Sequence, residues 1–184
     1  LYAKSLDCSV GVAMGGKNRE VPVYGSGGFN TIQSPEEAAE QASRYIERGV
    51  KAVKPRVAGS SKDEKVIEAV RFAIGDRADL MLDANEKCDQ TSAIRLLEIA
   101  SNHNTLFVEE PLPAHNLSGY RQISARSSSA IALGEHLQGA GRVSRSRSAP
   151  PGRRAGHRSS RGTQAGPCIS SASSGQQPGL PPQV

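Results

Sequence analysis

Three acidic residues recur along this chain at equal intervals, and each closes a short apolar run. The acids are Asp83, Glu109 and Glu135, and 26 residues separate each from the next. That interval holds one strand, one helix and two short loops. Because consecutive units of this kind place their strand ends at one edge of a parallel sheet, we expect the acids to converge there. Converging carboxylates are the ligands that a hard divalent cation such as Mg²⁺ requires.

The same repeat extends towards the N-terminus. Two earlier runs, residues 21–25 and 51–57, are strand candidates, and helical patterns lie between the strands at residues 34–49, 61–75, 89–101 and, more weakly, 115–124. Strands that alternate with helices predict an α/β fold with a parallel sheet. The equal period favours a partial (β/α) barrel with about five of its eight strands over an open sheet. The alternation predicts that Val53, Leu82, Phe107 and Leu133 point into the barrel.

The composition changes abruptly near residue 140. Residues 141–184 are rich in Ser, Gly, Pro and Arg, and they contain no Lys, Asp, Glu or aromatic residue. We expect this tail to be disordered, because its few large aliphatic residues are too scattered to form a core. The formal net charge of +5 comes from the tail, so the basic pI carries no information on the partners of the folded part.

Cellular context is only broadly constrained by the sequence. No apolar run is long enough to span a membrane, and the first residues lack the apolar segment of a signal peptide. Three widely spaced cysteines form neither a metal motif nor a disulfide framework, which favours a reducing, cytoplasmic location. The chain does not begin with Met, which indicates a fragment.

Several short motifs together resemble the mandelate racemase/muconate lactonizing enzyme branch of the enolase superfamily. They are Val-Pro-Val-Tyr-Gly-Ser-Gly-Gly at 21–28, Gly-Val-Lys-Ala-Val-Lys at 49–54, Met-Leu-Asp-Ala-Asn at 81–85, Phe-Val-Glu-Glu-Pro at 107–111 and Leu-Gly-Glu at 133–135. The resemblance implies that residues 1–16 are the end of a capping domain and that residues 17–139 form a partial (β/α) barrel. The disordered tail that the composition predicts then occupies residues 140–184. The resemblance also implies homo-oligomeric full-length relatives.

The resemblance further implies a Mg²⁺-dependent enzyme that abstracts the proton α to the carboxylate of a small-molecule substrate and stabilises the resulting enediolate on the metal. Carried over by position, the metal ligands are Asp83, Glu109 and Glu135. Asn85, two residues after Asp83, and His136, directly after Glu135, are candidate substrate-binding residues. Glu110 is expected to face away from Glu109, because adjacent strand residues face opposite sides. It is expected either to support the metal ligands without binding the metal or to have a structural role.

Lys54 and Arg56 are candidate catalytic residues, since residues two apart on a strand share a face. Many members of this family carry Lys at both positions, and the second Lys is a base. Arg56 departs from that pattern. A guanidinium group does not give up its proton in proteins, so it makes a poor base. We expect it to bind an anion or to form an ion pair with a neighbouring ligand acid. The departure favours an acid-sugar dehydratase over a racemase or cycloisomerase, which remain the alternatives.

Histidines raise a difficulty for this interpretation. The family takes a base from a His–Asp pair on later strands, but only His136 and His157 follow Glu135. We therefore expect this chain to be inactive as it stands. The tail has two interpretations: translation of the DNA in a wrong reading frame after about residue 139, which we favour, or a natural basic arm that binds nucleic acid through Arg–phosphate contacts.

Overall fold

Five parallel backbone segments, in the order of the sequence, form the centre of the molecule. A computed structural model describes residues 1–17 and 20–136 of the chain. Strand β1 (Ala52–Val53) pairs with β2 (Asp79–Leu80), and β3 (Leu82–Asp83), β4 (Val108–Glu109) and β5 (Ile131–Ala132) form a second parallel sheet in that order. Backbone bridges from Gly25 to Val53 and from Arg56 to Asp83 extend the pairing. The segments thus follow one another as in a partial (β/α) barrel, and no closed barrel forms within the described residues.

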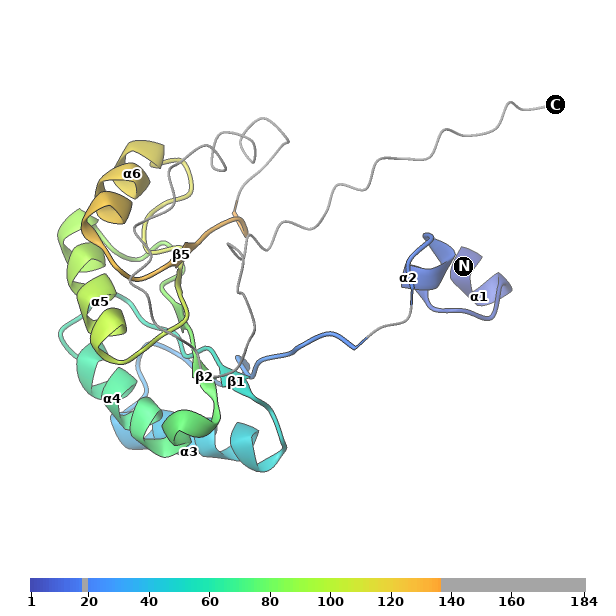
Figure 1. Cartoon of the computed structure of the whole chain (residues 1–184), viewed down its shortest axis with the longest axis horizontal. Helices are drawn as coiled ribbons and strands as arrows, with labels where there is room; N and C mark the ends of the chain where they lie inside the picture. Colours follow the sequence, from blue (N-terminus) through green and yellow to red (C-terminus); the bar gives the residue numbers. More distant parts are fainter. Residues whose placement is uncertain (18–19, 137–184) are drawn as a thin grey trace.

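Four amphipathic helices cover one side of these strands, and Figure 1 shows them as an arc. They are α3 (Pro35–Glu47), α4 (Asp63–Ile74), which runs into the 3₁₀ turn η1 (Gly75–Arg77), α5 (Gln90–Asn102) and α6 (Leu117–Arg126). Ser34 and Asp89 begin α3 and α5 with reciprocal capping boxes, which satisfy backbone N–H groups at the helix start. All four helices lie where the 3.6-residue periodicity predicts them, within two or three residues at each end.

A single apolar core fills the space between the strands and the helices. Its fully buried members include Val53, Leu80, Leu82 and Val108 from the strands, and they pack with helix residues such as Ile67 and Leu96. Since neighbours on a strand face opposite sides, Leu82 and Val108 face away from Asp83 and Glu109. The expectation that Val53 and Leu82 point into the barrel is therefore wrong. They belong to the helix-facing layer, whereas Phe107 is only half-buried.

The first predicted strand is much shorter than expected. Within residues 21–25 only Gly25 joins the sheet: its N–H donates to the Ala52 carbonyl at 2.9 Å, and its carbonyl accepts from Lys54 N at 2.8 Å. Val21 and Val23 remain exposed. The ring of Tyr45 lies so close to Gly25 that a Cβ there would come within 2.3 Å of it. Glycine is thus the residue that allows the segment to reach the sheet.

The N-terminal residues form two short helices, α1 (Tyr2–Ser5) and α2 (Val10–Ala13), in which no residue is buried. The prediction that residues 1–16 end a capping domain therefore stays a prediction. The predicted tail lies outside the described residues. Within the described ranges, none of the helices combines the length and the apolar character needed to cross a membrane.

Candidate active site

Asp83 and Glu109 are neighbours at the same edge of the sheet. They are register partners on β3 and β4, so their side chains leave adjacent parallel strands at the same level. Both are almost fully buried, with exposed fractions of 4% and 7%. Two carboxylates held this closely away from water repel each other unless a cation lies between them.

Lys54 supplies that positive charge. Its Nζ donates to Glu109 Oε2 and lies 3.6 Å from Asp83 Oδ2, and the ring of Tyr24 is 5.0 Å away. Burial by itself lowers the pKa of Lys54, but the hydrogen bond and charge of Glu109 and the charge of Asp83 outweigh it and raise the pKa above its usual value. Lys54 therefore stays protonated at neutral pH and is not set up to accept a proton. Its side chain lies beside two of the predicted metal ligands, and its catalytic role stays a prediction.

The donor atoms around this charge suit Mg²⁺. Asp83 and Glu109 offer hard, anionic oxygens, the ligand type that Mg²⁺ prefers. The ammonium group shows that the pocket between the two carboxylates already accommodates a positive charge. The residues present therefore fit a divalent cation, and Asp83 and Glu109 are the two that would hold it.

Glu135 does not lie level with the other two acids. Strand pairing places Glu109 opposite Ala132, so Glu135 lies three residues beyond the last paired position of β5. Its side chain is exposed. Equal spacing in sequence puts side chains at the same height along the strands only if the intervening helix and loops have the same geometry. The two units here differ, because Asp83 pairs with Glu109 whereas Glu109 pairs with Ala132. The role of Glu135 as third ligand stays a prediction.

The other predicted site residues lie around the same edge. Arg56 is exposed, in contrast to Lys54, and makes no ion pair with any acid in the described part of the chain. Its backbone bridge to Asp83 nevertheless keeps it beside the site. Asn85 is half-buried, and its N–H donates to Asp83 Oδ1 at 3.1 Å. That bond orients one of the predicted ligands.

Glu86, Glu110 and His136 form a second cluster that sequence reasoning did not identify as a unit. One potential ligand atom from each lies within 4.8 Å of the others. Glu110 is fully buried and contacts His136 Nδ1, so His136 meets a protein carboxylate rather than pointing freely towards a substrate. Burial alone raises the pKa of Glu110, but hydrogen bonds from His136 and from backbone N–H groups lower it overall. The same contact raises the pKa of His136.

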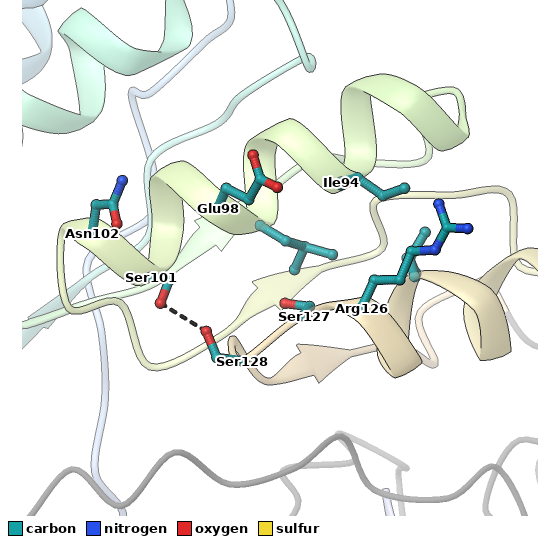
Figure 2. Close-up of a pocket in the computed structure, with 9 residues that line it drawn as sticks. Ile94, Glu98, Ser101, Asn102, Arg126, Ser127 and Ser128 are labelled. Atoms are coloured by element: carbon teal, nitrogen blue, oxygen red, sulfur yellow. Dashed lines mark hydrogen bonds between the residues drawn. The ribbon is translucent and has the colours of Figure 1, made fainter.

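A separate pocket lies between α5 and α6, at the other end of the strands from the acids. Its volume is about 230 Å³, and its lining includes Leu97, Glu98, Arg126 and Ser128 (Figure 2). Arg126 ends α6, and Ser128 lies in the turn that leads into the start of β5. None of the predicted site residues lines it. The predicted site residues therefore lie apart from this pocket.

Comparison with protein families gives one match over most of the described region. The model of the family described as "Enolase C-terminal domain-like" matches residues 37–148. The matched residues include Lys54, Asp83, Glu109 and Glu135.

Comparison with curated proteins finds sugar-acid enzymes. The chain is 30% identical to D-gluconate dehydratase of Thermoproteus tenax over 74% of its length, and 32% identical to L-talarate/galactarate dehydratase of Salmonella typhimurium over 74%. It is 35% identical to D-galactarolactone cycloisomerase of Agrobacterium fabrum over 76%. The chain covers only 30%, 35% and 38% of these relatives, respectively.

Solved structures of the same kind share the fold. A mandelate racemase/muconate lactonizing enzyme from Jannaschia sp. CCS1 matches 78% of this chain with a TM-score of 0.68 and 29% identity, and the match covers 43% of that protein. A structure described as a putative mandelate racemase, from Bordetella bronchiseptica RB50, matches 72% of this chain with a TM-score of 0.67 and 27% identity. That match covers 37% of the Bordetella protein.

Proposed function

The chain belongs to the enolase C-terminal domain-like family, and from this premise we propose that it carries the metal- and carboxylate-binding part of a sugar-acid dehydratase. One observation carries the proposal: the buried carboxylates of Asp83 and Glu109 lie level on adjacent strands, and the ammonium group of Lys54 contacts both of them. Such a pair holds positive charge at the mouth of a parallel sheet, where enzymes of this architecture bind their substrates.

Asp83, Glu109 and Glu135 would hold Mg²⁺ in this proposal. When bound, the cation would supply positive charge that lowers the cost of removing the proton α to a carboxylate. Arg56, which is exposed and bridged to Asp83 through the backbone, would bind the substrate carboxylate through paired hydrogen bonds. Lys54 would contribute a fixed positive charge, since its neighbours keep it protonated.

The overall reaction is the loss of water from a polyhydroxy acid. The C–H bond α to the carboxylate breaks, the hydroxyl group on the next carbon leaves with a proton as water, and the resulting enol becomes a ketone. The step needs a base for the α-proton. Lys54 keeps its proton beside the two acids, a guanidinium group is unsuited to act as a base, and His136 contacts Glu110. We therefore assign no base among residues 1–17 and 20–136. His157 lies outside the described residues.

Substrate binding without turnover is therefore the expected behaviour of the 184-residue chain. Saturation-transfer NMR with D-gluconate and with galactarate should detect binding that requires Mg²⁺ and is weakened about tenfold or more by Arg56→Leu, which removes a charge-assisted contact. Lys65→Met, at an exposed lysine in α4, is the matched control. In D₂O the α-proton should not exchange measurably faster than in buffer.

Two results would contradict the proposal in different ways. Sugar-acid binding that is independent of both Mg²⁺ and Arg56 would remove the assigned site. Rapid α-proton exchange would show that the chain contains a working base and would overturn the expectation of binding without turnover.

A cycloisomerase is the second candidate function. The observation in its favour is the 35% identity to D-galactarolactone cycloisomerase, over a similar part of the chain. Cycloisomerisation uses the same carboxylate and metal chemistry but retains the oxygen that a dehydratase releases as water. Stronger Mg²⁺-dependent binding of D-galactarolactone than of the open-chain acids, in the same NMR experiment, would favour this alternative.

A further inference from the structure

Glu110 directly follows the proposed metal ligand Glu109, and its side chain is fully buried. Glu110 Oε1 accepts hydrogen bonds from the backbone N–H groups of Gly134 and of His136, each at 3.1 Å. Glu110 Oε2 contacts His136 Nδ1. One carboxylate therefore makes three contacts, and all of them go to residues that immediately precede and follow Glu135.

We propose that Glu110 is a positioning residue that fixes the backbone around Glu135 so that this acid can serve as the third metal ligand. The proposal rests on the proposed function. Glu135 itself lies beyond the paired part of β5, so the sheet alone does not determine its position. The two N–H bonds to Glu110 supply the missing constraint, because they hold the peptide groups on both sides of Glu135.

The neighbouring loop takes part in the same network. Glu86 N donates to the Glu110 carbonyl at 2.7 Å, and the Glu86 carboxylate accepts from Ala114 N. Glu86 and Glu110 both have positive φ angles, 62° and 41°. Residues other than glycine adopt this conformation at an energetic cost, so the surrounding contacts have to hold it. Hydrogen bonds thus connect the loops that follow β3, β4 and β5, next to the proposed ligands in sequence.

The cluster could also be read as a separate cation site, but its contacts argue against this. Both oxygens of Glu110 already have partners in the chain, and Glu86 Oε1 is used by Ala114 N. No buried side-chain polar atom in the described part of the chain lacks a hydrogen-bond partner. A cation bound by His136 Nδ1 would have to break the contact of that nitrogen with Glu110, whereas the positioning role uses all of these contacts as they stand.

Metal affinity measured by Mn²⁺ electron paramagnetic resonance on the full chain tests the proposal. Partners behind metal ligands typically contribute about 10- to 100-fold in affinity, so Glu110→Ala should weaken Mn²⁺ binding by about that factor. Glu110→Gln should bind with intermediate affinity, because its amide oxygen can still accept from Gly134 and His136. Glu98→Ala, on the exposed face of α5, is the control and should bind like wild type.

Hydrogen exchange of the metal-free chain gives a readout that does not depend on the ion. The amides of Gly134 and His136 should exchange at least tenfold faster in Glu110→Ala than in wild type, and close to the wild-type rate in Glu110→Gln. A merely structural role of Glu110 would lower overall stability but leave the Mn²⁺ affinity of the folded molecules unchanged. If Glu110→Ala does not fold, Glu110→Met takes its place, because Met has a similar length but no oxygen that could accept from Gly134 and His136; reduced affinity then supports the proposal and wild-type affinity overturns it.

The outcomes separate this inference from the function on which it rests. If wild type binds no Mn²⁺, or if Asp83→Asn leaves the affinity unchanged, the proposed function fails and the positioning role fails with it. If binding depends on Asp83 but not on Glu110, only the positioning role is overturned.

Discussion

At the scale of single residues, the charge on Lys54 determines what the site can be. Its ammonium lies between two buried carboxylates, and their attraction keeps its pKa above the usual value despite burial. A lysine in this environment neutralises its neighbours rather than accepting a proton. The alternation of side chains along a strand predicts the face on which Lys54 lies, and its ammonium does lie beside Asp83 and Glu109. Its protonation depends on which acids come close, which the order of residues does not reveal.

Replacement of Lys54 by Met should expose this dependence. The variant leaves Asp83 and Glu109 buried without their cation, so the metal-free chain should lose about 3 kcal/mol of unfolding free energy. Added Mg²⁺ should restore more stability to Lys54→Met than to wild type. Urea unfolding with and without Mg²⁺ measures both quantities. Lys65→Met, which removes an exposed lysine, should change neither by more than about 0.5 kcal/mol. Equal losses in the two variants would argue against the ion pair.

The contact between Glu110 and His136 makes stability depend on pH. The lowered pKa of Glu110 gives stability that is present above its unfolded value, near 4.5, and is lost as the pH falls through the folded pKa. The raised pKa of His136 gives stability that is present below its unfolded value, near 6.5, and is lost as the pH rises through the folded pKa. In metal-free protein, the difference in unfolding free energy between wild type and His136→Gln should be largest between about pH 4.5 and 6.5. A difference that does not vary with pH would contradict the pairing.

At the scale of elements, the sequence predicts the positions of the helices far better than the register between the strands. Ser34 and Asp89 marked the starts of α3 and α5 because a cap is a local interaction. Register is not local. The 26-residue interval holds from Asp83 to Glu109, but β4 and β5 pair with an offset that places Ala132, and not Glu135, opposite Glu109. Likewise, Glu110 and His136 meet across 26 residues through a loop geometry that no sequence motif specifies.

Close packing of Gly25 against Tyr45 allows a test of the first strand segment. Gly25→Ala should lower the unfolding free energy by about 1–3 kcal/mol, because its Cβ would overlap the Tyr45 ring. In a Tyr45→Ala background the same change should cost clearly less, since the ring has gone. Thermal or urea unfolding of the two single variants and the double variant gives the coupling between the sites. Strictly additive losses would show that the ring does not restrict residue 25.

At the scale of the whole molecule, the chain corresponds to only part of the relatives that it matches. It spans about a third of the length of the curated relatives named above, and its described strands form five neighbouring parallel segments. Ligand binding to the native state alone stabilises it by about 2.7 kcal/mol when the free ligand is at 100 times its Kd. Mg²⁺ should therefore raise the thermal midpoint of the wild-type chain in a concentration-dependent way, which differential scanning fluorimetry can follow. An unchanged midpoint at saturating Mg²⁺ would contradict binding to the folded form.

The central claim is that Asp83 and Glu109 together hold a divalent cation at the strand ends, and calorimetric titration of Mg²⁺ into the 184-residue chain tests it most directly. Wild type and Glu98→Gln should bind one Mg²⁺ with equal affinity. Asp83→Asn and Glu109→Gln should each weaken binding at least tenfold, because each replaces a charged oxygen ligand by a neutral one. Binding by wild type that survives both substitutions unchanged, or no binding by wild type, would contradict the account.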